Sequence, residues 1–176
     1  MIIREANQSD ASGIAKVHVD CWRSTYAGIV PTDFLADLSF HESEKFWRDV
    51  LVDSNMPGFV YVAVNDAGQI VGYIAGGPER EGNRLFEGEF YSIYILKEFQ
   101  RQGIGRSLIA AASKKLLQSG LKSVMLWTLA VNPYRGFFET IGGQVVSEEI
   151  IEIGGSGLVQ VAYGWSDLSE LAAKSD

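Results

Sequence analysis

The sequence predicts a single α/β domain over residues 1–176, in which a mixed sheet carries helices on both faces. Length and composition are the first observation: 176 residues, 47% of them hydrophobic and 21% charged, suit one soluble globular domain with a full core. The order of the expected elements is the second: a strand, helices, three strands, a helix, a strand, a helix and a final pair of strands. This order gives a sheet of about seven strands.

The first half of the chain reads as one strand, three helices and a hairpin. Ser9 or Asp10 can cap the first helix, whose inward positions Ile14, Val17 and Cys21 recur at helical spacing. Asn65-Asp66-Ala67-Gly68 is a strong hairpin signal between two apolar strands. The expected elements are a strand at 2–6, helices at 9–26, from 31 and at 41–53, the last ended by Met56-Pro57-Gly58, and strands at 59–64 and 69–76.

The second half is expected to alternate strand and helix and to close with a hairpin. Strand-favouring residues fill 89–95, and a glycine turn then opens a helix that Gly120 stops. Gly142-Gly143 caps the next helix. The last residues, 166–176, are polar and are expected to fray. The other elements are expected at 123–129 (a strand), 133–141 (a helix), and 144–153 and 158–165 (a hairpin).

The stretch 89–108 joins a strand to a helix through the turn Gly103-Ile104-Gly105. The first amides of a helix lack internal partners and the helix dipole is positive there, so such a turn can bind a phosphate group. Arg101 and Arg106 add positive charge on either side. A mononucleotide loop would need a lysine after the second glycine, and a dinucleotide fingerprint would need a glycine in place of Leu108, so neither motif fits.

The pattern Gln100-x-x-Gly103-x-Gly105 resembles the pyrophosphate loop of the acyl-CoA-dependent N-acetyltransferases, the GNAT superfamily. The resemblance covers nearly the whole chain and implies an N-acetyltransferase with acetyl-CoA as its cosubstrate. Further segments that resemble the family are Ile3-Arg4-Glu5-Ala6 with Asp10, Glu89 eleven positions before Gln100, and Asn132-Pro133 with Phe137-Phe138-Glu139 and Gly142-Gly143.

The resemblance also implies a mostly antiparallel sheet that splays between its fourth and fifth strands, with a β-bulge near Ile93-Tyr94-Ile95. Backbone groups freed there would pair with the pantetheine arm, and amides from Arg101 to Arg106 would take the pyrophosphate. Asn132 would hydrogen-bond the pantetheine arm or cap its own helix. The cofactor-binding residues that the resemblance implies are Ile93, Tyr94, Ile95, Gln100, Arg101, Gln102, Gly103, Ile104, Gly105, Arg106, Ser107, Asn132, Arg135 and Phe138.

An amine must lose a proton before it attacks a thioester, so the reaction needs a base. The resemblance places Glu89 in this role, directly or through a water; the alternative is a solvated strand-end carboxylate, and Glu87 is the second candidate base. Phe138 stands where many family members have a tyrosine that protonates the leaving thiolate. We favour a thiolate that leaves unaided, since such a thiol has a pKa of about 8.5. Tyr134, one turn earlier, is the candidate acid if one is needed.

The resemblance places the acceptor site between the first two helices and the loop before the fourth strand. Trp22 and Tyr26, one helical turn apart, are the candidate substrate-binding residues together with Glu87 and Tyr91, although such aromatics also serve as core. Aromatic walls would suit an apolar or cationic amine. We expect a small primary amine: an amino acid, a polyamine or an antibiotic. The alternatives are a protein or peptide amine, and a non-catalytic acyl-CoA sensor.

Charge and composition argue against several other classes. The net charge of −7, with no basic cluster, argues against a nucleic-acid partner. No run of eighteen apolar residues and no signal-peptide pattern occur, so we expect a cytoplasmic protein without a membrane partner. Cys21 is the single cysteine, and neither His18 nor His41 stands at metal-ligand spacing from other candidate ligands, so we expect no metal. A homodimer is compatible with the resemblance, and nothing in the sequence decides it.

Overall fold

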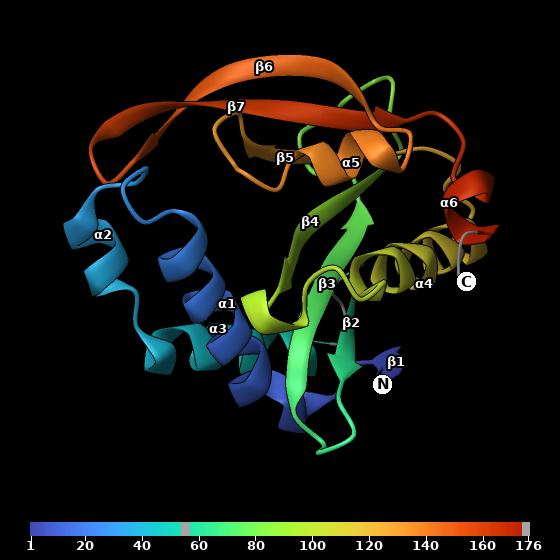
Figure 1. Cartoon of the computed structure of the whole chain (residues 1–176). Helices are drawn as coiled ribbons and strands as arrows, with labels where there is room; N and C mark the ends of the chain where they lie inside the picture. The colour runs from blue at the N-terminus through green and yellow to red at the C-terminus, as the bar shows by residue number, and fades with distance from the viewer. Residues whose placement is uncertain (54–56, 174–176) are drawn as a thin grey trace.

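The computed structural model describes residues 1–53 and 57–173, and its centre is one seven-stranded sheet in the order β1-β2-β3-β4-β5-β7-β6 (Figure 1). Every neighbouring pair is antiparallel except β4 and β5, which run parallel. The mixed, mostly antiparallel sheet that the sequence predicts is therefore confirmed. The strands are β1 (Ile2–Glu5), β2 (Phe59–Val64), β3 (Ile70–Pro78), β4 (Gly88–Ile95), β5 (Val124–Leu129), β6 (Gln144–Ile153) and β7 (Ser156–Trp165).

Helices cover both faces of this sheet, because successive residues of the central strands point to opposite sides. Val62 and Tyr73 pack in one buried cluster with α1, whereas Ala63 and Ile74 pack in another with α4. The helices are α1 (Ala11–Thr25), α2 (Thr32–Asp37), α3 (Phe40–Val52), α4 (Ile104–Gln118), α5 (Gly136–Thr140) and α6 (Ser169–Ala173), with short 3₁₀ turns η1 (Gln8–Asp10) and η2 (Lys97–Phe99).

Two predicted segments differ from the structure. The helix expected at 133–141 shrinks to α5, since Asn132 and the residues after it form turns. The fraying expected over 166–176 is wrong for 169–173, which form α6 because Leu168 and Leu171 are buried against the rest of the core. Residues 174–176 and the predicted helix-ending Met56 fall outside the described residues.

The sheet separates into two parts between β4 and β5. Only Gly88 with Val124 and Glu89 with Met125 are paired there. In Figure 1, β5, β7 and β6 turn away from β1–β4 beyond this point. The bulge of β4 lies at Tyr91, earlier than the predicted 93–95, since Phe90 pairs with Gly76 and Ser92 with Ala75. The glycines opposite make room for it: a Cβ on Gly77 would lie 2.6 Å from the Tyr91 hydroxyl.

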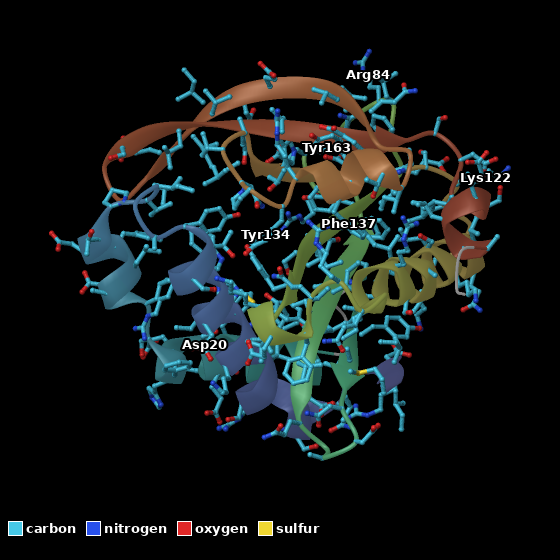
Figure 2. All side chains as sticks on the ribbon, viewed as in Figure 1. Asp20, Arg84, Lys122, Tyr134, Phe137 and Tyr163 are labelled. Atoms are coloured by element: carbon cyan, nitrogen blue, oxygen red, sulfur yellow. The ribbon has the colours of Figure 1, made fainter. Side chains whose placement is uncertain are left out.

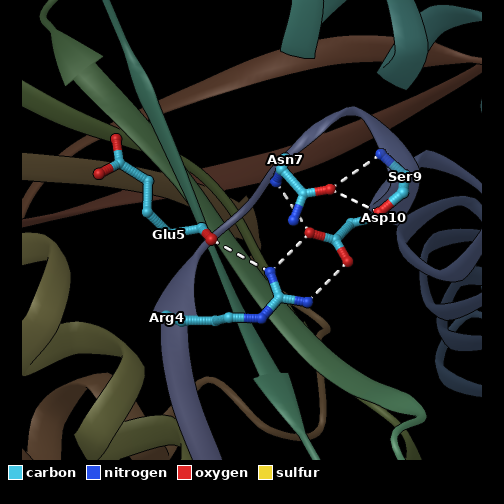
Figure 3. A network of polar contacts seen from close by, with 5 residues as sticks. All are labelled: Arg4, Glu5, Asn7, Ser9 and Asp10. Carbon is cyan, nitrogen blue, oxygen red and sulfur yellow. Dashed lines mark hydrogen bonds and ion pairs between the residues drawn. The ribbon is translucent and has the colours of Figure 1, made fainter.

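A half-buried ion pair joins the end of β1 to the start of α1 (Figure 3). Arg4 Nη1 and Nη2 donate to the two carboxylate oxygens of Asp10 at 2.7 and 2.8 Å. Asp10 Oδ2 also accepts the Asn7 amide, and Asn7 Oδ1 accepts the Ser9 amide in return, a capping box. The hydrogen bonds from Arg4 lower the pKa of Asp10 below its ordinary 3.8, against the opposing effect of burial.

We expect Asp10→Asn to lower the free energy of unfolding at neutral pH by about 1–2 kcal/mol, a modest figure because Arg4 is partly exposed and screened. A lowered pKa stabilises the fold above about pH 4, so the difference between variant and parent should shrink as the pH falls through the lowered pKa. Urea unfolding between pH 2.5 and 7 measures this. Asp20→Asn, which breaks an exposed pair with Lys16 on α1, is the control and should cost less. A constant difference at all pH values would contradict the prediction.

Candidate active site

A groove of about 780 Å³ opens where β4 and β5 part. Its walls come from α1, the end of β4, the turn before α4, and the segment from Asn132 into α5. Most of the residues assigned to the cofactor line it: Ile93, Tyr94, Ile95, Gln100, Arg101, Gly103, Ile104, Gly105, Arg106, Asn132 and Phe138. Cys21, Thr25, Phe99 and Phe137 also line it and were not expected there.

Three of the assigned residues do not line the groove. Gln102 Nε2 donates to the Glu98 carbonyl at 3.1 Å, and Ser107 Oγ donates to the Gly103 carbonyl at 3.3 Å. Arg135 lies just before α5 and acts electrostatically on Tyr163 instead. The reason is the late start of α5, which leaves Arg135 in a turn rather than on the helix face that was expected.

The turn before α4 leaves the backbone amides of residues 104–106, which line the groove, without a backbone acceptor in the part of the chain that the structure describes. Gln100 Nε2 donates to the Ile95 carbonyl at 3.0 Å and so closes the turn at the end of β4. Arg101 (φ 61°) and Gly103 (φ 82°) both take left-handed backbone conformations, which reverse the chain into the helix. Ser107 is the first residue of α4 whose amide bonds back, to Gly103. No acceptor within the described residues faces the amides of 104–106, which can bind an anion.

Gly105 allows α4 to pack closely against the residues that line the groove beside it. A Cβ at this position would lie 3.1 Å from Phe137 Cζ and 3.3 Å from Ile95 Cδ1. The glycine therefore lets α4 approach α5 and β4 closely, which a larger residue would prevent. Figure 2 shows Phe137 and Tyr134 in the opening between α1 and α5, and both line the groove.

A second, smaller hollow of about 70 Å³ lies next to the groove. It shares Ile93, Tyr94, Asn132 and Phe138 with the groove, so the two hollows meet where β4 and β5 part. Its other lining residues are Tyr26, Phe90, Tyr91, Ser92, Leu126, Trp127 and Thr128. The hollow thus has aromatic walls, two hydroxyl groups from Ser92 and Thr128, and no ionised lining residue.

Asn132 ties the two halves of the site together. Its Nδ2 donates to Thr128 Oγ1 on β5 at 2.9 Å and to the Tyr26 hydroxyl at 3.3 Å. Its Oδ1 accepts the Tyr134 amide at 2.9 Å and so begins the turn that leads into α5. Burial raises the pKa of Tyr26, which therefore stays neutral in this network.

Glu89 is buried and paired with an arginine. Its side chain is 6% exposed, and its oxygens accept from Arg80 Nε at 3.0 Å and Arg80 Nη2 at 2.6 Å. Arg80 also lies over the Tyr91 ring, 4.0 Å from its centroid. Glu89 lines neither hollow but adjoins the smaller one through Tyr91. The alternative of a solvated carboxylate does not fit this burial. Sequence reasoning did not identify Arg80 as a partner of Glu89.

The other candidate substrate-binding residues have separate roles. Tyr26 and Tyr91 line the small hollow. Trp22 packs on Tyr26, with ring centroids 4.9 Å apart, and lines neither hollow. Glu87 lies away from both because its carboxylate accepts the Lys122 amide at 2.6 Å.

In residues 1–53 and 57–173, no helix is both long enough and apolar enough to cross a bilayer. The same residues contain no group of three or more His, Cys, Asp or Glu side chains that could hold a metal ion.

Comparisons with known proteins agree on one family. Residues 17–142 match the model of the "Acetyltransferase (GNAT) family". The chain is 41% identical over 169 residues to the uncharacterized N-acetyltransferase YuaI of Bacillus subtilis (strain 168), covering 96% of this chain and 95% of that one.

Solved structures share the fold at low identity. The PaiA N-acetyltransferase of Thermoplasma acidophilum, solved in complex with coenzyme A, superposes with a TM-score of 0.73 at 20% identity, covering 90% of this chain and 96% of that one. The ribosomal-protein-alanine N-acetyltransferase of Brucella melitensis superposes with a TM-score of 0.71 at 20% identity, covering 94% and 99%.

We expect Asn132→Ala to lower the free energy of unfolding by about 1–3 kcal/mol, because the Tyr26 hydroxyl, Thr128 Oγ1 and the Tyr134 amide each lose a hydrogen bond to this side chain. Thr128→Val is the matched control, since it removes one acceptor of the same network and should cost less. Thermal and urea unfolding measure both. Equal stability of Asn132→Ala and the parent would show that Asn132 does not hold the two halves together.

Proposed function

The chain belongs to the acetyltransferase (GNAT) family, and on this premise we propose that it transfers the acetyl group of acetyl-CoA to a primary amine of a small molecule. As a member of that family, it is an acyltransferase enzyme. The observation that carries the proposal is the pair of hollows that meet where β4 and β5 part, one long and ending at free helix amides, one small and aromatic.

The groove suits an acyl-CoA. At one end, the free amides of 104–106 together with Arg101 and Arg106 match a pyrophosphate in charge and in hydrogen bonding. Along its middle, β4 has no strand partner on the β5 side beyond Glu89, so its backbone is available to the amides of a pantetheine arm. When bound there, acetyl-CoA supplies the acetyl group as an activated thioester.

The small hollow suits the acceptor. It is next to the inner end of the groove, and its volume of about 70 Å³ accommodates an amine group rather than a folded segment. Tyr26, Tyr91 and Trp127 would surround the amine with aromatic rings. A protein would have to present a lysine side chain or an N-terminal amine here, which is the alternative to the small molecule that we propose.

The proton of the amine would pass to Glu89. Because Glu89 adjoins the hollow and does not line it, we propose that a water held by the hydroxyls of Ser92 or Thr128 links the amine to the carboxylate. Phe138 lies between both hollows and cannot donate a proton. Tyr134 and Tyr94 are the phenols that line the groove, and of these Tyr134 is our candidate should the thiolate need an acid.

Release of free thiol from acetyl-CoA, read across a panel of small amines and peptides, tests the proposed function. Thiol release that depends on a small amine supports it, and release with peptides alone would replace the small molecule by a protein acceptor. Calorimetry should show CoA binding in either case. Binding without release on any acceptor would favour a non-catalytic acyl-CoA sensor.

We expect Gly103→Asp to weaken CoA binding by at least roughly 100-fold, because a carboxylate would face the pyrophosphate, an effect of about 3 kcal/mol. Gly103→Asn is the control: it has the same size, tolerates the left-handed backbone at φ 82° and carries no charge. Calorimetric titration with CoA compares the two. If both variants bind CoA as the parent does, the pyrophosphate does not lie at this turn.

We expect Glu89→Gln to keep CoA binding and to lose about 10²–10⁴-fold in turnover at neutral pH, the usual contribution of a general base. Partial recovery at high pH should follow, since more of the amine is then already deprotonated. Initial rates from pH 6 to 10 measure this. Turnover that matches the parent would remove Glu89 from the mechanism.

A further inference from the structure

The loop between β3 and β4 places Arg80 against Glu89, and nothing in the proposed reaction so far uses Arg80. Both oxygens of the carboxylate are engaged by the two-pronged guanidinium, at 3.0 and 2.6 Å. The Glu89 side chain is 6% exposed and that of Arg80 is 57% exposed. A cation that reaches in from the surface therefore neutralises a carboxylate that water hardly reaches.

Arg80 is held in place by the same residue that forms the bulge of β4. Its guanidinium lies 4.0 Å from the ring centroid of Tyr91, and the Tyr91 hydroxyl donates to the Pro78 carbonyl at 2.6 Å. Tyr91 is the extra residue in the pairing of β4 with β3 and also lines the small hollow. The residue at the bulge of β4 thus also supplies the aromatic surface on which the guanidinium lies.

We propose that Arg80 is the positioning residue of Glu89: its guanidinium holds the carboxylate in one orientation beside the small hollow and supplies the positive charge that compensates it. The acid side of the pH dependence of turnover is then set by this ion pair. The inference rests on the proposed role of Glu89 as the base.

The loop that carries Arg80 also contains three acidic side chains and Arg84. Glu79 accepts the amides of Glu81 and Asn83, and Glu87 accepts the Lys122 amide. Hydrogen bonding to Glu89 raises the pKa of Arg80, and Glu81 and Tyr91 add to this. Burial raises the pKa of Tyr91, which stays neutral.

Arg80 is the one cation that forms an ion pair with Glu89 in the described part of the chain. Without Arg80, Glu89 would stay buried and lose this compensating positive charge, and burial without an opposite charge disfavours the charged form of a carboxyl group.

The test compares the pH dependence of kcat/KM in the parent, Arg80→Gln and Arg80→Lys. We expect Arg80→Gln to move the acid limb to higher pH by about one pH unit, the lower end of the range for losing an adjacent opposite charge, because Arg80 is partly exposed. In Arg80→Lys the acid limb should return part of the way to its position in the parent, but kcat should stay lower. The reason is that an ammonium group supplies the charge without the bidentate hydrogen bond to Glu89 or the stacking on Tyr91.

Arg84→Gln is the matched control, because Arg84 is on the same loop and exposed, and Figure 2 shows it at the outer edge of the molecule. It should leave the profile unchanged. An acid limb of Arg80→Gln that coincides with that of the parent would overturn the inference.

A second readout does not depend on turnover. In protein with ¹³C-labelled glutamate carboxyl groups, the signal assigned through Glu89→Gln should titrate at higher pH in Arg80→Gln, and in part in Arg80→Lys, than in the parent. An unmoved signal overturns the inference even if the acceptor amine is still unidentified.

If Glu89→Gln loses turnover while neither the acid limb nor this signal moves in the Arg80 variants, the proposed function stands and the inference fails. If Glu89→Gln keeps full turnover, the role of Glu89 fails and the inference with it.

Discussion

The early separation of β4 from β5 is the constraint on which the rest of this structure depends. A parallel pair that continued would satisfy both strand edges and leave no hollow between them. Here the pairing stops after Glu89 and Met125, and a bulge at Tyr91 turns β4 at this point. The chain thereby leaves backbone groups of β4 unpaired, which is a cost unless a ligand or water satisfies them. The site exists because the sheet is incomplete.

An incomplete sheet must be held together by other contacts, and side chains from both halves do this. Asn132 joins Tyr26 of the first half to Thr128 of the second by hydrogen bonds. The turn between β6 and β7 packs on α2, where a Cβ on Gly154 would lie 2.8 Å from Phe34 Cβ. The buried cluster of Tyr26, Val30, Leu35 and Leu129 continues this contact. These contacts lie on the other side of the opening from the Gly88–Val124 and Glu89–Met125 pairs of β4 and β5. Together with those pairs they fix the width of the groove.

Local patterns were predictable and long-range partners were not. The turn from Gln100 to Gly105 was predictable because it is a local backbone feature of six residues, which the glycines mark. The pair of Arg80 with Glu89 was missed since the two lie nine positions apart across an irregular loop, where charge patterns give no geometry. The helix α6 was missed because its signal is brief: Leu168 and Leu171 become informative only when α4 is there to cover them. Arg135 was assigned to the groove by the family resemblance, whereas in the structure it lies in the turn before α5 and does not line the groove.

The acidic composition of the chain does not by itself indicate a polycationic acceptor. The loop before β4 carries Glu79, Glu81, Glu87 and Glu89, partly offset by Arg80 and Arg84, and this composition is typical of a solvated loop. In the structure, three of these carboxylates are already used: Glu79 and Glu87 accept backbone amides, and Glu89 accepts Arg80. The small hollow itself has no ionised lining residue. A polycationic acceptor would therefore meet aromatic rings and hydroxyls there rather than free carboxylates, so aromatic contact with a single amine group is the recognition that these residues support.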